Sequence, residues 1–193
     1  MNYQPPIILA SVSPRRRQLL SDAGYQIKVV PPTIDESAFA SERIEPCEYA
    51  ERLALAKAKN VAGDFPESLV IGADTIVDLK GEIIGKPANA EEAEQITRKL
   101  FGAVHKVITG LAIVKISDNI ELVSSDITVV YPRKMSDEQI SSHIKGGTWQ
   151  GKAGAYAIQE TGDEFVEKIQ GSLTNVMGLP MELLQKMLKK VVG

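Results

Sequence analysis

The sequence predicts an α/β protein in which helices pack against a mixed, twisted sheet. Strand-like and helix-like segments alternate in the first part of the chain, which favours parallel pairing. Two long apolar segments at residues 105–116 and 120–133 are joined by a short polar turn, which favours an antiparallel pair. No repeat and no Pro- or Ser-rich linker divides the 193 residues, so we expect one domain over residues 1–193.

The individual elements follow from apolar spacing and from turn residues. Short apolar runs predict strands at residues 7–10, 26–30, 69–79, 83–87, 105–116, 120–133 and around 165–169. Amphipathic spacing predicts helices at residues 14–24, 46–63, 90–102, 136–147 and from Pro180 onward. Ser136 is an N-capping signal for the fourth of these helices.

Composition and charge exclude several classes of protein. The chain is 44% hydrophobic and 24% charged, and its formal net charge of −3 gives no electrostatic reason to expect nucleic acid or an anionic membrane as a partner. Cys47 is the single cysteine, which excludes an intramolecular disulfide and favours a reducing cytoplasm. No segment approaches the roughly 20 apolar residues of a spanning helix, and the first residues do not resemble an export signal. We therefore expect neither export nor membrane insertion.

The first predicted helix begins with a cationic turn at residues 13–17, SPRRR. Serine is a favoured N-cap and proline a favoured first helical residue, so the helix begins here. Three guanidinium groups beside the positive end of the helix dipole are unfavourable unless an anion compensates them. Because helix N-termini and arginine forks both match phosphate oxygens, the turn predicts a phosphate site, with Ser11 as a further donor. The alternative is a solvated turn that is merely basic.

Lys57 interrupts the apolar stripe of the predicted helix that starts at Pro46. Ala50, Leu53 and Ala58 mark this stripe, and Lys57 lies seven residues after the first of them. A lysine on a buried face needs a charged partner, or else its stem lies along apolar surface while the ammonium reaches water. The sequence leaves these two interpretations equally open.

Asp74 interrupts an apolar run, residues 69–79, that otherwise reads as a buried strand. An ionised carboxylate there is costly unless it is paired or binds a metal. The alternative is that the strand ends at Gly72 and that Asp74 begins a turn. Lys86 and Asp126 raise the same question more weakly, since each also fits an exposed strand position.

Three familiar kinds of site lack support. Gly146, Gly151 and Lys152 have the spacing of a phosphate-binding P-loop, but Ala153 replaces the required Ser or Thr, and the preceding segment is a predicted helix rather than a strand. His105 and His143 have no metal-ligand spacing. No catalytic triad or nucleophile elbow is visible either.

Eight short motifs run in order along nearly the whole chain: LASVSPRRRQLL, DES, RLALAKAK, GADTIV, GEIIGKP, SDITV, KAGAYAIQ and NVMGLP. As an ordered set they resemble the Maf family of nucleotide pyrophosphatases. The resemblance implies a two-lobed α/β fold with a central cleft, similar to that of the inosine triphosphate pyrophosphatases. It also implies a nucleoside triphosphate substrate, Mg²⁺ or Mn²⁺ as cofactor, and a homodimer.

Carried over position by position, the resemblance implies a set of site residues. The expected substrate-binding residues are Ser11, Arg15, Arg16, Lys57, Thr75, Lys86, Lys152 and Gln159. The expected metal ligands are Glu36, Asp74 and Asp126, with Asp74 also the general base. A triphosphate and its metal would then give Lys57 and Asp74 a common explanation.

Three positions resemble those that separate the branches of the family. Arg15, Thr75 and Gln159 match the branch that resembles dTTP/UTP pyrophosphatases, which release the monophosphate and pyrophosphate. The sequence departs from the family pattern at residues 149–151 and at Glu160, and both departures flank the base pocket that the resemblance implies. The alternatives are a pyrophosphatase for 7-methyl-GTP or for inosine-type nucleotides, and a nucleotide-sensing regulator of septum formation without turnover.

Overall fold

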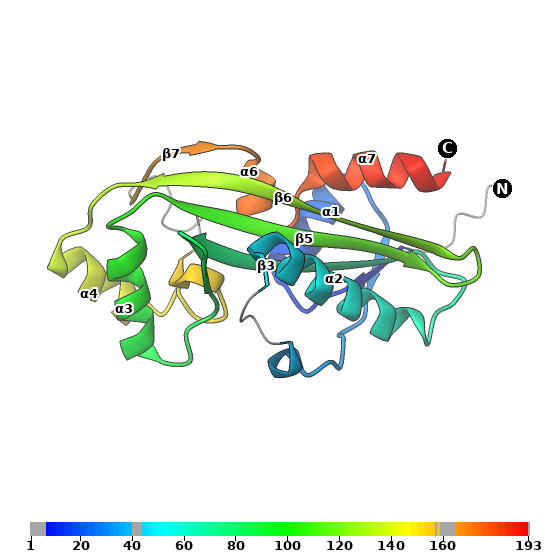
Figure 1. Cartoon of the computed structure of the whole chain (residues 1–193), viewed down its shortest axis with the longest axis horizontal. Coiled ribbons are helices and arrows are strands. Elements are labelled where there is room, and N and C mark those ends of the chain that lie inside the picture. The colour runs from blue at the N-terminus through cyan, green and yellow to red at the C-terminus, as the bar shows by residue number, and fades with distance from the viewer. Residues whose placement is uncertain (1–6, 40–43, 157, 159–164, 193) are drawn as a thin grey trace.

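A mixed sheet forms the centre of the molecule and confirms the predicted α/β class (Figure 1). The computed structural model describes residues 7–39, 44–156, 158 and 165–192. Within these residues the sheet has seven strands in the order β2-β1-β3-β5-β6-β7, with β4 also paired to β3. The strands are β1 (Ile7–Ala10), β2 (Ile27–Val29), β3 (Val70–Leu79), β4 (Glu82–Ile84), β5 (His105–Lys115), β6 (Ile120–Pro132) and β7 (Val166–Gln170). β1 is parallel to β2 and β3, and the other pairs are antiparallel.

Helices lie on both faces of this sheet. They are α1 (Pro14–Asp22), α2 (Pro46–Ala62), α3 (Ala90–Leu100), α4 (Asp137–Gly146), α6 (Leu173–Val176) and α7 (Met181–Val192), with 3₁₀ turns η1 (Glu36–Ala38) and η2 (Ala153–Ala155). The predicted cap of α4 is confirmed, because the Ser136 side chain accepts a hydrogen bond from the backbone of Gln139. Ser13 stands at the N-cap of α1, but its side chain makes no cap bond, and its backbone N–H donates to Ser11 Oγ at 3.2 Å. Among the described residues, no helix has the length and apolarity that crossing a bilayer requires.

Three long strands connect two groups of helices. β3, β5 and β6 run from the end that carries α1, α2 and α7 to the end that carries α3 and α4 (Figure 1). At the first end, Leu20 and Leu184 pack with Ile71 in an apolar core. At the second, Leu100 and Val77 belong to another core. The shared strands therefore hold two packed groups at a fixed separation, as the two-lobed expectation requires.

Helix α2 lies unusually close to the sheet because glycines face it. A Cβ added to Gly72 of β3 would lie 2.2 Å from the backbone oxygen of Ala54, and one added to Gly110 of β5 would lie 2.2 Å from that of Ala50. Real atoms cannot approach to this distance, so any larger residue would push α2 outward. The two glycines thus set the depth at which side chains of α2 meet β3.

A buried histidine ties β5 to the second group of helices. His105 is 2% exposed, its Nδ1 lies 3.1 Å from the Ala103 carbonyl oxygen, and its Nε2 lies 2.9 Å from the Tyr156 hydroxyl. A carbonyl can only accept, so Nδ1 carries the hydrogen and Nε2 accepts from Tyr156 in the neutral ring. Burial lowers the pKa of His105 below its ordinary value, although hydrogen bonds to backbone oppose this effect.

This lowered pKa predicts a loss of stability in mild acid. Below its ordinary pKa of about 6.5, histidine is protonated in the unfolded chain but stays neutral in the fold, so stability is complete above that pH and falls below it. We expect the free energy of unfolding to fall from pH 7 to pH 5, with one proton contributing at most about 1.4 kcal/mol per pH unit. Urea denaturation should show a shallower fall in His105→Gln. Identical slopes in both proteins would exclude His105 as a cause.

Candidate active site

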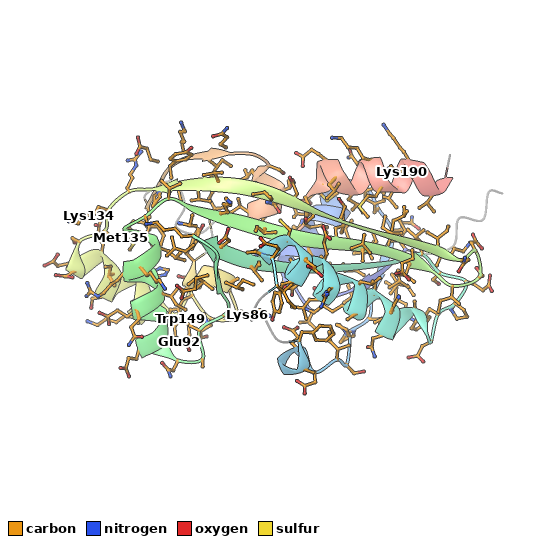
Figure 2. All side chains as sticks on the ribbon, viewed as in Figure 1. Lys86, Glu92, Lys134, Met135, Trp149 and Lys190 are labelled. Atoms are coloured by element: carbon orange, nitrogen blue, oxygen red, sulfur yellow. The ribbon has the colours of Figure 1, made fainter. Side chains whose placement is uncertain are left out.

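A cleft of about 500 Å³ opens where one edge of β3 lacks a strand neighbour. β1 pairs with β3 only as far as Gly72, and β4 pairs with it only from Val77 onward. In the described part of the chain, residues 73–76 therefore face a gap between these two strands. Side chains of α1 and α2 line the cleft together with the segments after β4 and around η2, and in Figure 2 Lys86 lies between the end that carries α3 and the end that carries α2.

Lys57 and Asp74 form a buried ion pair in this cleft. Nζ of Lys57 lies 2.6 Å from Oδ1 of Asp74, and the two residues are 5% and 6% exposed. Glu36 of η1 supplies a second carboxylate, with Oε1 2.8 Å from the same ammonium. Both open questions are thereby answered: Lys57 has charged partners rather than reaching water, and β3 continues through Asp74 to Leu79.

The Glu36 carboxylate is held in its ionised form. Burial on its own would raise the pKa of Glu36, but the hydrogen bond and charge of Lys57, together with the charges of Lys86 and Arg16, outweigh it and leave the pKa below its ordinary value. Glu36 therefore carries its negative charge throughout the neutral range and stays available as an oxygen ligand.

Arg16 fastens three segments around the cleft through uncharged acceptors. Its Nε donates to the Gly178 carbonyl oxygen at 2.7 Å. Its Nη1 donates to Ser11 Oγ at 3.1 Å and to the Ala73 carbonyl oxygen at 2.9 Å, and its Nη2 donates to Thr75 Oγ1 at 3.0 Å. These partners use four of the five guanidinium hydrogens without neutralising the charge. Burial lowers the pKa of Arg16, opposed by the charge of Asp74, and the arrangement favours a bound anion.

Three further cations line the cleft. Arg15 comes from the first turn of α1, Lys86 from the segment after β4, and Lys152 from the segment before η2. Lys86 is exposed, whereas Arg15 and Lys152 are partly buried. These side chains therefore line the cleft from both sides of the gap in the sheet. The structure thus brings together the described substrate-binding residues expected from the sequence.

Two expected residues are not in this group. Asp126 of β6 pairs with Thr109, which pairs with Thr75, so its side chain lies on the face of the sheet opposite Asp74. It is also two strands from β3, about 10 Å away, and its Oδ1 accepts a hydrogen bond from the backbone of Ile127. The structure therefore does not support Asp126 as a ligand beside Asp74. Gln159 lies outside the described residues.

The carboxylates that remain fit a magnesium-like ion. Their hydrogen bonds to Lys57 engage one oxygen each of Glu36 and Asp74. Among the described residues no group of three His, Cys, Asp or Glu side chains converges. Mg²⁺ is commonly held by one or two carboxylates, with substrate phosphates and water completing its shell. Two hard oxygen ligands beside a cationic cleft match that pattern.

One residue that the sequence analysis did not single out lies behind the polar lining of the cleft. Thr109 of β5 is fully buried, and its Oγ1 lies 3.0 Å from Oγ1 of Thr75. A polar residue inside the apolar segment 105–116 was the available signal, the same kind of signal that marked Asp74. Threonine is common in strands, however, and the pattern alone does not distinguish a structural hydroxyl from one that acts on a site.

Fold and site together define an α/β protein with a cationic cleft that suits a polyanion, since Arg and Lys side chains outnumber carboxylates in its lining. Comparison with known proteins names the group. The family model for Maf-like proteins matches residues 6–191, and the chain belongs to this family, as its motifs predict.

Relatives align over nearly the whole chain. A protein of Citrifermentans bemidjiense named dTTP/UTP pyrophosphatase is 45% identical over 91% of this chain and 90% of its own. A protein of Dictyoglomus thermophilum with the same name is 42% identical over 96% of this chain and 95% of its own. A protein of a Synechococcus species named nucleoside triphosphate pyrophosphatase is 44% identical over 97% of this chain and 94% of its own.

The buried ion pair predicts an asymmetric response to mutation. Lys57→Met should lower the free energy of unfolding by about 3 kcal/mol, the usual cost of leaving a buried charge without its partner. Asp74→Asn should cost less, because Glu36 still pairs with Lys57. The double variant should recover part of the loss, since neither charge then remains. Urea denaturation with EDTA at pH 7 measures all three, and a fully stable Lys57→Met protein would contradict the expectation.

Proposed function

We propose that this protein is a nucleoside triphosphate pyrophosphatase that hydrolyses dTTP and UTP to dTMP or UMP and pyrophosphate. The observation that carries the proposal is the convergence of Glu36 and Asp74 on Lys57 within a cleft lined by further cations. Such a cleft can neutralise a triphosphate and present a carboxylate to water. The names of the full-length relatives support the same reaction and the same nucleotides.

The triphosphate would be held by charge from several directions. Lys86 and Lys152 line the cleft from different segments and would bind the phosphate oxygens. Arg16 would act mainly by its charge and by fixing Ser11 and Thr75, because those bonds already use most of its hydrogens. Positive charge fixed around the phosphates stabilises the charge on their oxygens in the transition state, which is the protein's main contribution to such reactions together with positioning.

A divalent cation, Mg²⁺ or Mn²⁺, would be held by Glu36 and Asp74. When bound, it supplies positive charge to the phosphate oxygens and to the leaving group. Lys57 contacts both carboxylates and so sets their separation and direction whether or not the ion is present. The lysine is thus proposed to organise the ligands as well as to balance their charge.

Asp74 would accept the proton of the attacking water. The water oxygen forms a bond to the α-phosphorus, the bond between that phosphorus and the oxygen bridging to the β-phosphorus breaks, and pyrophosphate leaves. Asp74 is rigidly placed for this role because it lies within a long paired strand and its carboxylate is held by Lys57. A base fixed in this way needs little rearrangement during the reaction.

The base would lie at the less charged end of the cleft. Val77 and Val107 line the cleft beside Thr75 on one face of the sheet, and Val176 and Met177 line it from α6 and the residue after α6. An apolar wall with a single hydroxyl suits a planar pyrimidine. Gln159 and Arg15 are proposed as further contacts of the base, in keeping with the three positions that resemble the dTTP/UTP branch.

The names of the relatives do not favour the 7-methyl-GTP, inosine-type or purely regulatory alternatives. We expect the reaction to act on the nucleotide pool of the cytoplasm, because the single cysteine favours a reducing compartment. The homodimer implied by the resemblance stays a prediction that sedimentation equilibrium can check.

Substitution of the proposed base should separate catalysis from folding. We expect Asp74→Asn to lower kcat on dTTP by at least ~100-fold, the scale of losing a catalytic base, while its circular dichroism stays that of the wild type. Asp78→Asn is the matched control, because Asp78 is a buried carboxylate of the same strand that bonds the turn at Gly81 instead of the cleft. Near-normal turnover by Asp74→Asn would refute the assigned role.

A substrate panel tests the base preference. We expect kcat/KM for dTTP and UTP to exceed that for dATP or 7-methyl-GTP by at least ~10-fold, as one or two unpaired polar groups would impose. Ion-exchange chromatography of the products should show the monophosphate and pyrophosphate. A profile led by 7-methyl-GTP, or release of orthophosphate, would show that the proposed substrate or reaction is wrong.

A further inference from the structure

The hydroxyl of Thr75 lines the cleft, and whether it donates or accepts a hydrogen bond decides which base it can bind. It is the polar group among Val77, Val107, Val176 and Met177 on the cleft wall proposed above to receive the base. A threonine hydroxyl has one hydrogen to donate and two lone pairs to accept with. A free hydroxyl could therefore rotate to suit either a donor or an acceptor on the base.

The surrounding hydrogen bonds remove that freedom. Nη2 of Arg16 can only donate, so Thr75 Oγ1 accepts from it at 3.0 Å. Thr109 Oγ1 donates to the backbone carbonyl of Asn175 at 3.1 Å, which uses its single hydrogen because a carbonyl can only accept. In the 3.0 Å contact between the two hydroxyls, Thr75 must therefore be the donor. Its hydrogen is consumed, and it has one lone pair left.

The far end of this chain of bonds is itself fixed. The Asn175 residue is fully buried, and its Nδ2 donates to the Val107 carbonyl oxygen and to Thr128 Oγ1, both at 3.0 Å. The carbonyl that receives the Thr109 hydrogen thus cannot move away without breaking bonds to β5 and β6. The direction of the whole chain, from Arg16 to Asn175, follows from its two ends.

We propose that Thr109 is a positioning residue for base selection: it takes the Thr75 hydrogen and so makes Thr75 an obligate acceptor toward the cleft. This inference rests on the proposed function. With N3 of the base directed at Thr75, thymine and uracil donate their N3–H to this acceptor, whereas N3 of cytosine carries no hydrogen and would face the Thr75 lone pair. The arrangement selects dTTP and UTP against dCTP and CTP without any contact between Thr109 and substrate.

Substitutions at Thr109 test this role. Wild type should prefer dTTP over dCTP in kcat/KM by at least ~10-fold, the scale expected when a polar group is left unpaired. Thr109→Val frees the Thr75 hydrogen to point into the cleft, and should reduce this ratio by ~5-fold or more, mainly through KM. Thr109→Ser keeps the hydroxyl and should restore the ratio. Thr97→Val is the matched control, because it removes a buried hydroxyl that donates to the Ala93 carbonyl oxygen within α3.

The possible results distinguish a failure of this inference from a failure of the proposed function. If wild type hydrolyses dTTP and UTP but turns over dCTP equally well, the inference fails and the proposed function stands. If Thr109→Val loses activity on both nucleotides alike and keeps their ratio, Thr109 is only structural and the inference again fails. If wild type hydrolyses neither dTTP nor UTP, the proposed function fails and the inference falls with it.

A second variant and a second measurement guard against poor folding. Thr109→Ala removes the same hydroxyl with less bulk, so it replaces Thr109→Val if that protein does not fold. Competitive inhibition by dTMP and dCMP compares the two bases without any chemistry. The ratio of their inhibition constants should shift toward dCMP in the hydroxyl-free variants and stay at the wild-type value in Thr109→Ser. An unchanged ratio in both hydroxyl-free variants would overturn the inference.

Discussion

The close packing of α2 against β3 and β5 is the constraint on which the site depends. Because Gly72 and Gly110 have no side chains, the helix backbone approaches the sheet to a distance that any Cβ would prevent. Only at that depth does Lys57 reach Asp74 as a buried pair. A buried carboxylate without such a partner would be strongly destabilising, so the glycines make it possible to keep a charged group inside the sheet.

The gap along the β3 edge turns one strand into two kinds of binding surface. Successive residues of a strand point to opposite faces, so Asp74 faces α2 while Thr75 faces α6. With a partner strand in the gap, these two faces would be separated by the sheet. Without one, the cleft reaches both, and charged groups on one side of β3 and apolar groups on the other can serve a single ligand. This division matches a nucleotide, which is highly charged at one end and planar and largely apolar at the other.

The sequence predicts most elements and draws attention to Lys57 and Asp74, because a charge that breaks an apolar pattern is visible without a structure. It does not show that the two residues meet, since periodicity gives the buried face of a helix but not the strand beneath it. Asp126 shows the same limit in reverse: its face depends on the register between β5 and β6, which the pattern of residues does not contain. Thr109 also breaks an apolar run, yet its importance comes from a chain of bonds that only the fold assembles.

Arg16 shows how the fold prepares a site for an anion. Most of its hydrogens are spent on neutral oxygens of β3, of Ser11 and of Gly178, so the side chain is rigid while its charge stays uncompensated by these bonds. Arg15, Lys86 and Lys152 add positive charge around the same space, and mutual repulsion among such groups opposes folding. A ligand that neutralises them stabilises the folded state in proportion to its affinity and concentration. The cleft is therefore arranged for its bound state. The Lys57–Asp74 ion pair and the hydrogen bonds that run from Arg16 through Thr75 and Thr109 to Asn175 are formed by the fold itself, before any ligand binds.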